Sequence, residues 1–163
     1  MGGFGALLSN ARHRIGLLIA MAILLMSLSV ILSGDKETET IRIAFPNEQT
    51  LEGEVANTPE KLLFGLAFRD SMPAGAAMLF IYDQSGLHRV WTKAYRFPVD
   101  IVWADESKHI VHILEGVPPC AQEPCTRYGP PPSDARYVIE TNAGVVKQLG
   151  IAVGMEMKFT LVM

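Results

Sequence analysis

The sequence predicts an α+β, mostly β fold: a compact antiparallel β-barrel or sandwich-like domain with two short helices, preceded by one N-terminal transmembrane helix or signal segment. Three observations lead to this class. An uncharged, apolar run covers Ile15–Leu32. From residue 41 onward, short apolar segments rich in β-branched residues are bounded by Gly, Pro, Asp or Ser, and only two segments carry helix signals. Residues 35–163 fall in the size range of a single domain that can bury a core.

The apolar run determines the expected compartment. At about 1.5 Å per residue it covers roughly 27 Å, close to the bilayer's hydrocarbon core of about 30 Å. Arg12 and Arg14 precede it and favour the cytoplasmic side. The run is longer than an ordinary signal-peptide core and lacks a small-residue cleavage pattern. We therefore expect a single-pass anchor in the cytoplasmic membrane, with a secreted or periplasmic product after cleavage as the alternative.

This interpretation divides the chain into four parts. Residues 1–14 are expected to be a cytoplasmic n-region, 15–32 the signal anchor or signal peptide, 33–40 a polar linker, and 41–163 one extracytoplasmic domain on the periplasmic side. All seventeen acidic residues lie after residue 34, where only twelve basic residues accompany them, so this part carries a net charge of −5. An acidic domain without a basic stripe argues against nucleic acid as a partner. The expected partners are the membrane, through the N-terminal helix, and an unknown small ligand or envelope protein.

The first elements of the domain are a hairpin and a helix. Ile41–Phe45 and Leu51–Val55 read as strands because the turn-forming residues 46–49 separate them. Thr58 is a suitable N-cap, and the proline after it fits the first helical position, where a missing N–H is harmless. An apolar stripe then predicts a helix from Pro59 to about Phe68.

Further strands and one more short helix complete the domain. Asn142 is expected to cap a helix that runs through Gln148 and stops at Gly150. In the last strand, Met155–Leu161, apolar and polar residues alternate, so its methionines are expected in the core. Strands are predicted at Ala77–Tyr82, Arg89–Thr92, Val99–Trp103, Ile110–Leu114, Tyr137–Glu140 and Met155–Leu161, with antiparallel pairing as the simplest connection.

Both cysteines lie in one proline-rich loop over residues 117–134. Outside the cytoplasm, a disulfide between Cys120 and Cys125 is the expected fate of two nearby thiols. Two thiols cannot form a four-Cys zinc site, and a thioredoxin-type motif has two intervening residues, not four. His109 and His112 are three apart on a predicted strand and so point to opposite faces. We predict a structural disulfide, no metal site and no cofactor.

The candidate functional residues are charges embedded among apolar residues. Asp100 lies inside a predicted buried strand, where an unpaired carboxylate would be costly. Arg69 and Lys93 are its candidate partners, and Glu140 ends another strand. A buried salt-bridge network is the favoured interpretation, and a ligand pocket beside Trp91 and Trp103 is the alternative. The candidate ligand-binding residues are thus Arg69, Trp91, Lys93, Asp100 and Glu140.

Several short motifs occur in one order over about residues 51–160. They include Gly65-Leu66-x-x-Arg69, Met78-Leu79-Phe80, Trp91-x-Lys93, Pro98-x-Asp100-Ile101 and Val138-x-Glu140. Together they resemble domain of unknown function family 192. The resemblance implies a compact, mostly β fold with small helices, commonly behind a signal or anchor segment in bacteria and archaea, and no established activity. The chain departs from the usual pattern at Thr92, where the family has methionine, and at Ala94, where it has asparagine and an amide able to donate and accept.

Three functional hypotheses follow. The preferred one is a membrane-anchored extracytoplasmic module that binds a ligand or a protein without catalysis. The alternative is an envelope hydrolase or small-molecule enzyme in which Asp100, with Lys93 and Arg69, acts as acid or base. The third is an accessory subunit of a membrane assembly, concentrated at the membrane by its anchor.

Overall fold

The computed structural model describes residues 15–27 and 40–161. The chain divides into two units, Met1–Glu37 and Thr38–Met163. In the first unit, residues 15–27 form a helix. Among the described residues, no helix is both long and apolar enough to cross a membrane. The predicted n-region, residues 28–32 of the predicted span and residues 33–39 of the predicted linker lie outside the described residues.

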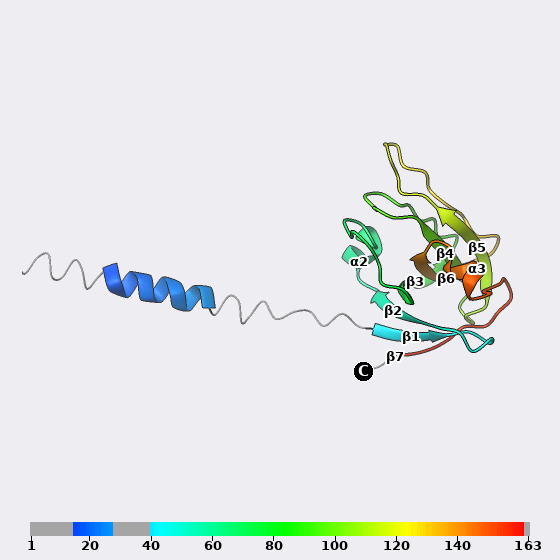
Figure 1. Ribbon diagram of the computed structural model, residues 1–163, viewed down its shortest axis with the longest axis horizontal. Coiled ribbons are helices and arrows are strands. Elements are labelled where there is room, and N and C mark those ends of the chain that lie inside the picture. The colour runs from blue at the N-terminus through cyan, green and yellow to red at the C-terminus, as the bar shows by residue number, and fades with distance from the viewer. Residues whose placement is uncertain (1–14, 28–39, 162–163) are drawn as a thin grey trace, which may run out of the picture. The chain divides into compact units, whose positions relative to one another are not determined.

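The second unit is built on one seven-stranded sheet that curls into a half-barrel (Figure 1). The mostly β, α+β class is confirmed. The expected antiparallel pairing is found between all neighbouring strands of the sheet except β2 and β3, which pair in parallel. A parallel pair needs a long crossover, which the segment carrying α2 supplies. In sheet order the strands are β5 (Ile110–Val117), β4 (Val99–Ala104), β6 (Ala135–Asn142), β3 (Ala76–Gly86), β2 (Thr50–Ala56), β1 (Thr40–Ala44) and β7 (Lys158–Leu161).

The segment before β7 joins the two edges of the curled sheet. The Gly154 N–H donates to the Ile110 carbonyl at 2.8 Å, and the Ile110 N–H donates to the Met155 carbonyl at 2.8 Å. The Met157 N–H donates to the Lys108 carbonyl at 2.9 Å. Met157 is fully buried, as the alternation of this segment predicts. β7 itself begins later than predicted, at Lys158, because residues 154–157 bond to the start of β5 instead.

The predicted hairpin and the start of the first helix are confirmed. β1 and β2 pair antiparallel, and α2 (Pro59–Phe64) is capped by Thr58, whose Oγ1 accepts the Lys61 N–H at 3.3 Å. The helix ends four residues earlier than predicted. At Gly65 the backbone turns to φ 51°, a conformation that glycine adopts readily, and this directs the chain out of the helix.

Two other elements differ from the prediction. The segment Arg89–Thr92 is not a strand of the sheet. Within the described part of the chain, its one β-bridge is the isolated antiparallel bridge between Val90 and Tyr128. The second helix of the domain, α3 (Val145–Gln148), is shorter than expected and is preceded by Gly144 rather than capped by Asn142. The Asn142 amide instead donates to the Met72 carbonyl at 2.9 Å.

Buried side chains form two clusters, which the alternation of the central strands assigns to opposite faces of the sheet. One cluster contains Leu79, Val102 and Ile139 with the residues of β1 and β2. The other contains Phe80, Trp103 and Val138. Because Glu140 is two residues after Val138 on β6, it lies on this second face.

Candidate ligand-binding site

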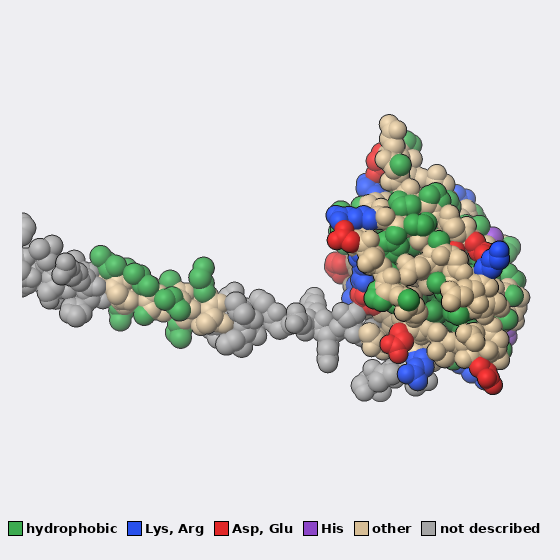
Figure 2. Space-filling model, viewed as in Figure 1, with side chains coloured by type: hydrophobic (Ala, Val, Ile, Leu, Met, Phe, Trp, Pro, Cys, Tyr) green, Lys and Arg blue, Asp and Glu red, His purple; other side chains and the backbone are tan. Residues whose placement is uncertain are grey.

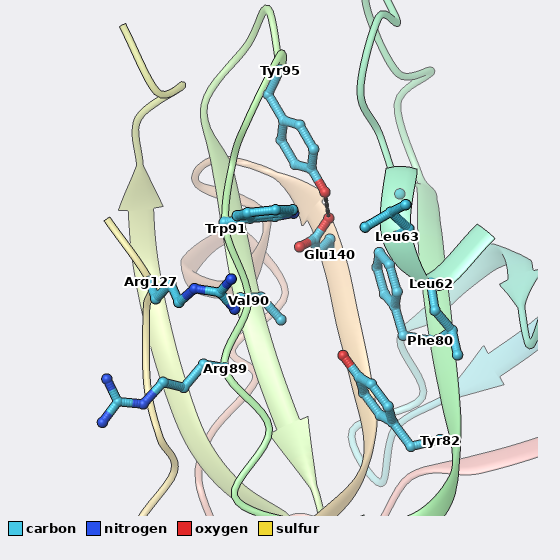
Figure 3. Close-up of a pocket in the computed structure, with 11 residues that line it drawn as sticks. Leu62, Leu63, Phe80, Tyr82, Arg89, Val90, Trp91, Tyr95, Arg127 and Glu140 are labelled. Carbon is cyan, nitrogen blue, oxygen red and sulfur yellow. Dashed lines mark hydrogen bonds between the residues drawn. The ribbon is translucent and has the colours of Figure 1, made fainter. Parts of the chain in front are cut away.

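A cavity of about 230 Å³ lies on the second face of the sheet, between α2, β3, β6 and the segment of residues 89–95 (Figure 3). Most of its wall is hydrocarbon or aromatic ring. Gly65 allows the end of α2 to approach closely, because a Cβ at this position would lie 2.7 Å from the Tyr95 Oη. The lining residues are Leu62, Leu63, Gly65, Phe80, Tyr82, Arg89, Val90, Trp91, Tyr95, Arg127 and Glu140.

A carboxyl group is buried in the wall of this cavity. Glu140 is 1% exposed, and its Oε2 accepts a 2.6 Å hydrogen bond from the Tyr95 hydroxyl. The Tyr95 Oη also accepts the Leu66 N–H at 3.3 Å. Burial raises the pKa of Glu140 to about 8, although the Tyr95 hydrogen bond lowers it. Glu140 therefore keeps its proton in most molecules at pH 7.

The second oxygen of Glu140 has a different environment. In Figure 3 it points away from Tyr95, on the side of Trp91. Among the described residues, the single hydrogen bond to the Glu140 carboxyl is the one from Tyr95. A protonated carboxyl group can both donate and accept, so Glu140 offers a polar contact to a molecule in the cavity.

Two tyrosines near Glu140 are held in their neutral form. Burial, and secondly the charge of Glu140, raises the pKa of Tyr82 to about 12. The same two causes, in the same order, raise the pKa of Tyr95 above its usual value. The Tyr82 ring is stacked on the His88 ring with a centroid distance of 3.7 Å. Both hydroxyls therefore stay protonated at neutral pH.

Trp91 lines both this cavity and a second hollow of about 200 Å³. The Arg127 Cζ lies 4.8 Å from the Trp91 ring centroid, and the Lys93 Nζ lies 5.8 Å from it. The second hollow is more apolar and is bordered by exposed hydrophobic side chains of α2 and the following turn. Its lining residues are Leu63, Phe64, Ala67, Phe68, Trp91, Lys93 and Ala94.

The proline-rich loop holds the Trp91 segment in place. Its predicted disulfide is confirmed, with Cys120 and Cys125 5.5 Å apart at Cα. The Cys120 N–H donates to the Thr92 carbonyl at 3.1 Å, and the Thr92 hydroxyl donates to the Pro118 carbonyl at 2.9 Å. Lys93 forms a 2.5 Å ion pair with Glu123. Thr92, one of the departures from the family pattern, thus has a structural contact.

The other departure, Ala94, has a backbone φ of 58°. This left-handed conformation costs an L-residue with a Cβ roughly 1–2 kcal/mol, and asparagine adopts it more readily than alanine. The conformation is fixed because the Ala94 carbonyl accepts the Phe68 N–H at 2.9 Å. The asparagine usual in the family suits this backbone.

We therefore predict that Ala94→Asn stabilises the protein by roughly 0.5–1 kcal/mol, since the new side chain lowers the cost of the left-handed conformation. Urea unfolding monitored by circular dichroism measures the change. Ala143→Asn, at an exposed position outside the left-handed region, is the control and is expected to leave the stability unchanged. A loss of stability in Ala94→Asn would contradict this explanation.

The structure brings only part of the predicted site together. Trp91 and Glu140 line the cavity, and Lys93 lines the neighbouring hollow. Arg69 is paired with Glu54 at 2.7 Å. Asp100 belongs to neither lining.

Among the residues that the structure describes, Asp100 does not form the predicted ion pair. Asp100 is fully buried, and backbone amides satisfy it: Oδ1 accepts the Gly116 N–H at 2.8 Å and Oδ2 accepts the Val146 N–H at 3.0 Å. On β4, Ile101 is directly opposite Glu140 of β6. Since successive side chains alternate, Asp100 and Glu140 lie on opposite faces of the sheet. One site cannot contain both.

Several residues of the cavity are not among those predicted from the sequence. Phe80 and Tyr82 follow Met78 at every second position of β3, a pattern that could have placed them on one face. Tyr95 and Arg127 lie in irregular segments, where no periodicity reports their direction. Among the described residues, no three His, Cys, Asp or Glu side chains are grouped so that they could hold a metal ion.

The fold and the cavity define a small half-barrel domain with a pocket that contains a buried acid. The chain belongs to the DUF192 family, described as Uncharacterized ACR, whose model matches residues 41–159. The comparison with curated proteins finds no match.

Two solved structures share the fold. A protein from Sinorhizobium meliloti 1021, described as a candidate transcription regulator, is 28% identical, with a TM-score of 0.64 over 74% of this chain and 92% of its own. A protein of unknown function from Novosphingobium aromaticivorans DSM 12444 is 20% identical, with a TM-score of 0.63 over 73% of this chain and 83% of its own.

Proposed function

We propose that this protein is an extracytoplasmic module that binds a small ligand, without catalysis, in the cavity lined by Trp91 and Glu140. The observation that carries the proposal is the buried Glu140–Tyr95 pair, which lies in one wall of the cavity with apolar and aromatic side chains such as Leu62, Phe80 and Trp91. Small-molecule sites typically combine such walls with a few fixed polar groups. Glu140 and Tyr95 can fix the orientation of a ligand, while the aromatic rings supply contact area.

The enzyme hypothesis has less support. An acid or base at Asp100 would need access to a substrate, whereas both of its oxygens accept backbone N–H groups and the side chain is fully buried. Lys93 and Arg69 are each paired with a glutamate elsewhere on the surface. The three residues named for catalysis thus have separate, structural partners.

An interaction module is a second candidate. The observation that favours it is a group of apolar side chains beside the second hollow, Leu63, Phe64 and Phe68, which are 55%, 51% and 64% exposed. An envelope protein or a membrane assembly could contact this patch. A ligand in the neighbouring cavity would contact Leu63 and Trp91, which belong to both hollows.

We also propose that the domain faces an oxidising compartment, held by the apolar segment 15–32 or released after cleavage. The Cys120–Cys125 disulfide supports this location, because such bonds persist mainly outside the cytoplasm. Regulation of transcription, the role described for the Sinorhizobium protein, has no support here. On the face drawn in Figure 2, basic and acidic side chains are interspersed, without the basic stripe that nucleic acid requires.

A fragment screen tests ligand binding directly. The full chain and its Trp91→Ala variant are compared by thermal shift against a library of small organic molecules. Removing the indole opens the wall of the cavity, so we expect fragments that stabilise the native protein to lose at least tenfold in affinity. Phe64 lines the second hollow and not the cavity, so Phe64→Ala is the matched control. This variant is expected to bind the same fragments with unchanged affinity. Fragments weakened by Phe64→Ala alone would favour the interaction patch, and fragments unaffected by either substitution would refute the proposed site.

A further inference from the structure

The geometry points to a ligand class: we propose that the cavity binds a small monoanion with a compact apolar body, such as an aryl-substituted carboxylic acid, whose acidic group meets Arg127 at the mouth. This inference rests on the proposed function and adds the charge and size of the ligand. Three independent observations carry it: the pairing of the arginines, the polarity of the interior and the volume of the cavity.

The arginines of the domain fall into two groups. The described residues contain six arginines, and four of them form ion pairs with carboxylates. The remaining two, Arg89 and Arg127, have no ion pair within the described part of the chain, and both line the cavity. In an acidic domain, where carboxylates outnumber cations, two unpaired guanidinium groups at one opening favour an anion there.

Arg127 is the better placed of the two. Its side chain extends toward Trp91 in Figure 3, with the Cζ 4.8 Å from the ring centroid, whereas Arg89 turns its guanidinium away from Glu140. Stacking on Trp91 orients the planar guanidinium, and its free N–H groups can then bind a carboxylate in bidentate fashion. Arg89 adds positive potential at the mouth without this orientation.

The interior accepts an anionic ligand without repelling it. Glu140 is the acidic residue in the lining, and it keeps its proton at neutral pH because it is buried. A protonated Glu140 can donate a hydrogen bond to the ligand, while Leu62, Phe80 and Val90 contact its apolar body. A cationic ligand would instead face Arg127 and Arg89, and it would gain a counter-ion only if Glu140 lost its proton.

The volume limits the ligand. Pockets for drug-sized molecules measure roughly 300–1,000 Å³. The cavity, at about 230 Å³, is smaller and suits one aromatic ring or a short branched chain. A longer body would have to continue past Trp91 into the second hollow, which shares Leu63 and Trp91 with the first.

Three matched probes separate charge from shape: 3-phenylpropionate, 3-phenylpropionamide and 3-phenylpropylamine. Their bodies are the same and their end groups are an anion, a neutral amide and a cation. Isothermal titration of the full chain at pH 7 is expected to give the tightest binding for the acid, at least tenfold tighter than the amide. Acetate, the acidic group without the body, is expected to bind at least tenfold more weakly than 3-phenylpropionate.

Variants assign the effect to Arg127. Arg127→Gln is expected to lower the affinity for 3-phenylpropionate about tenfold and to leave the affinity for the amide unchanged, since it removes a charge from an exposed side chain. Arg42→Gln also removes an exposed charge, but Arg42 does not line the cavity. This variant is the control and should leave the affinity for both probes unchanged.

The outcomes distinguish this inference from the function on which it rests. If the amine bound most tightly, or if all three probes bound equally, the anionic ligand class would be overturned, while the proposal that the cavity binds a small ligand would stand. An equal loss of acid and amide in Arg127→Gln would show that the side chain only packs on Trp91, which also overturns it. If none of the probes binds although neutral fragments occupy the cavity, the anionic ligand class is refuted and the proposed binding function stands. If no fragment binds in the cavity either, both proposals are refuted.

Discussion

Glu140→Gln is expected to remove most of a steep pH dependence of stability between about pH 4.5 and 8. The pKa of Glu140 is about 8 in the folded protein and 4.5 as its ordinary value. The folded state therefore binds more protons than the unfolded state in this window, and the stability contributed by the protonated group is lost as the pH rises. The expected slope is about 1 kcal/mol per pH unit. Glutamine does not ionise and keeps an oxygen to accept the Tyr95 hydroxyl.

Urea unfolding of the wild type and the variant at intervals from pH 4.5 to 8.5 measures this difference. Tyr95 and Tyr82 are the ionisable groups coupled to Glu140, and their raised pKa values keep them protonated over the window. Glu115→Gln, at an exposed position, is the control and should retain the wild-type slope. A wild type that gains stability toward pH 8, or a variant with the same slope, would contradict a protonated, buried Glu140.

Asp100→Ala is expected to destabilise the domain by about 3 kcal/mol or more. The substitution leaves the N–H groups of Gly116 and Val146 without their acceptor, and the buried one, that of Val146, alone costs about 1–3 kcal/mol. The loss of the partly buried Gly116 hydrogen bond adds to this cost. The substitution also releases the start of α3 from β4. Asp100→Asn keeps one acceptor but places an N–H₂ group against the second backbone donor, so a smaller loss is expected.

Chemical denaturation measures both variants, and Asp134→Ala, at an exposed loop position, is the control with little expected change. The result also decides between structural and catalytic roles. An Asp100→Asn protein that is as stable as the wild type would contradict the structural assignment and return Asp100 to the enzyme hypothesis.

The sequence was most informative where a local pattern determines the structure. Turn residues between two short apolar segments predicted the β1–β2 hairpin, and the Thr58-Pro59 pair predicted the start of α2. Spacing and compartment predicted the Cys120–Cys125 bond. In each case the interacting residues are close in the chain, so no knowledge of the sheet order is needed.

Which residues come together in the candidate site could not be predicted, because this depends on tertiary structure that no local sequence pattern contains. Whether Asp100 and Glu140 share a face depends on the register of β4 against β6, and a shift of one residue would reverse the answer. Arg89–Thr92 has the composition of a strand, but its hydrogen bonds go to the proline-rich loop, a tertiary contact. Tyr95 and Arg127 reach the cavity from two irregular segments that the disulfide loop brings together.

The two indole N–H signals of the protein, those of Trp91 and Trp103, report whether the cavity beside Trp91 is the binding site. Trp91 lines the cavity, whereas Trp103 is fully buried outside its lining, with its Nε1 donating to the His88 carbonyl at 2.9 Å. In a ¹H–¹⁵N spectrum of the full chain titrated with 3-phenylpropionate, the Trp91 signal should shift and saturate while the Trp103 signal stays in place. A saturable shift of Trp103 alone, or saturable binding that moves neither signal, would contradict the site.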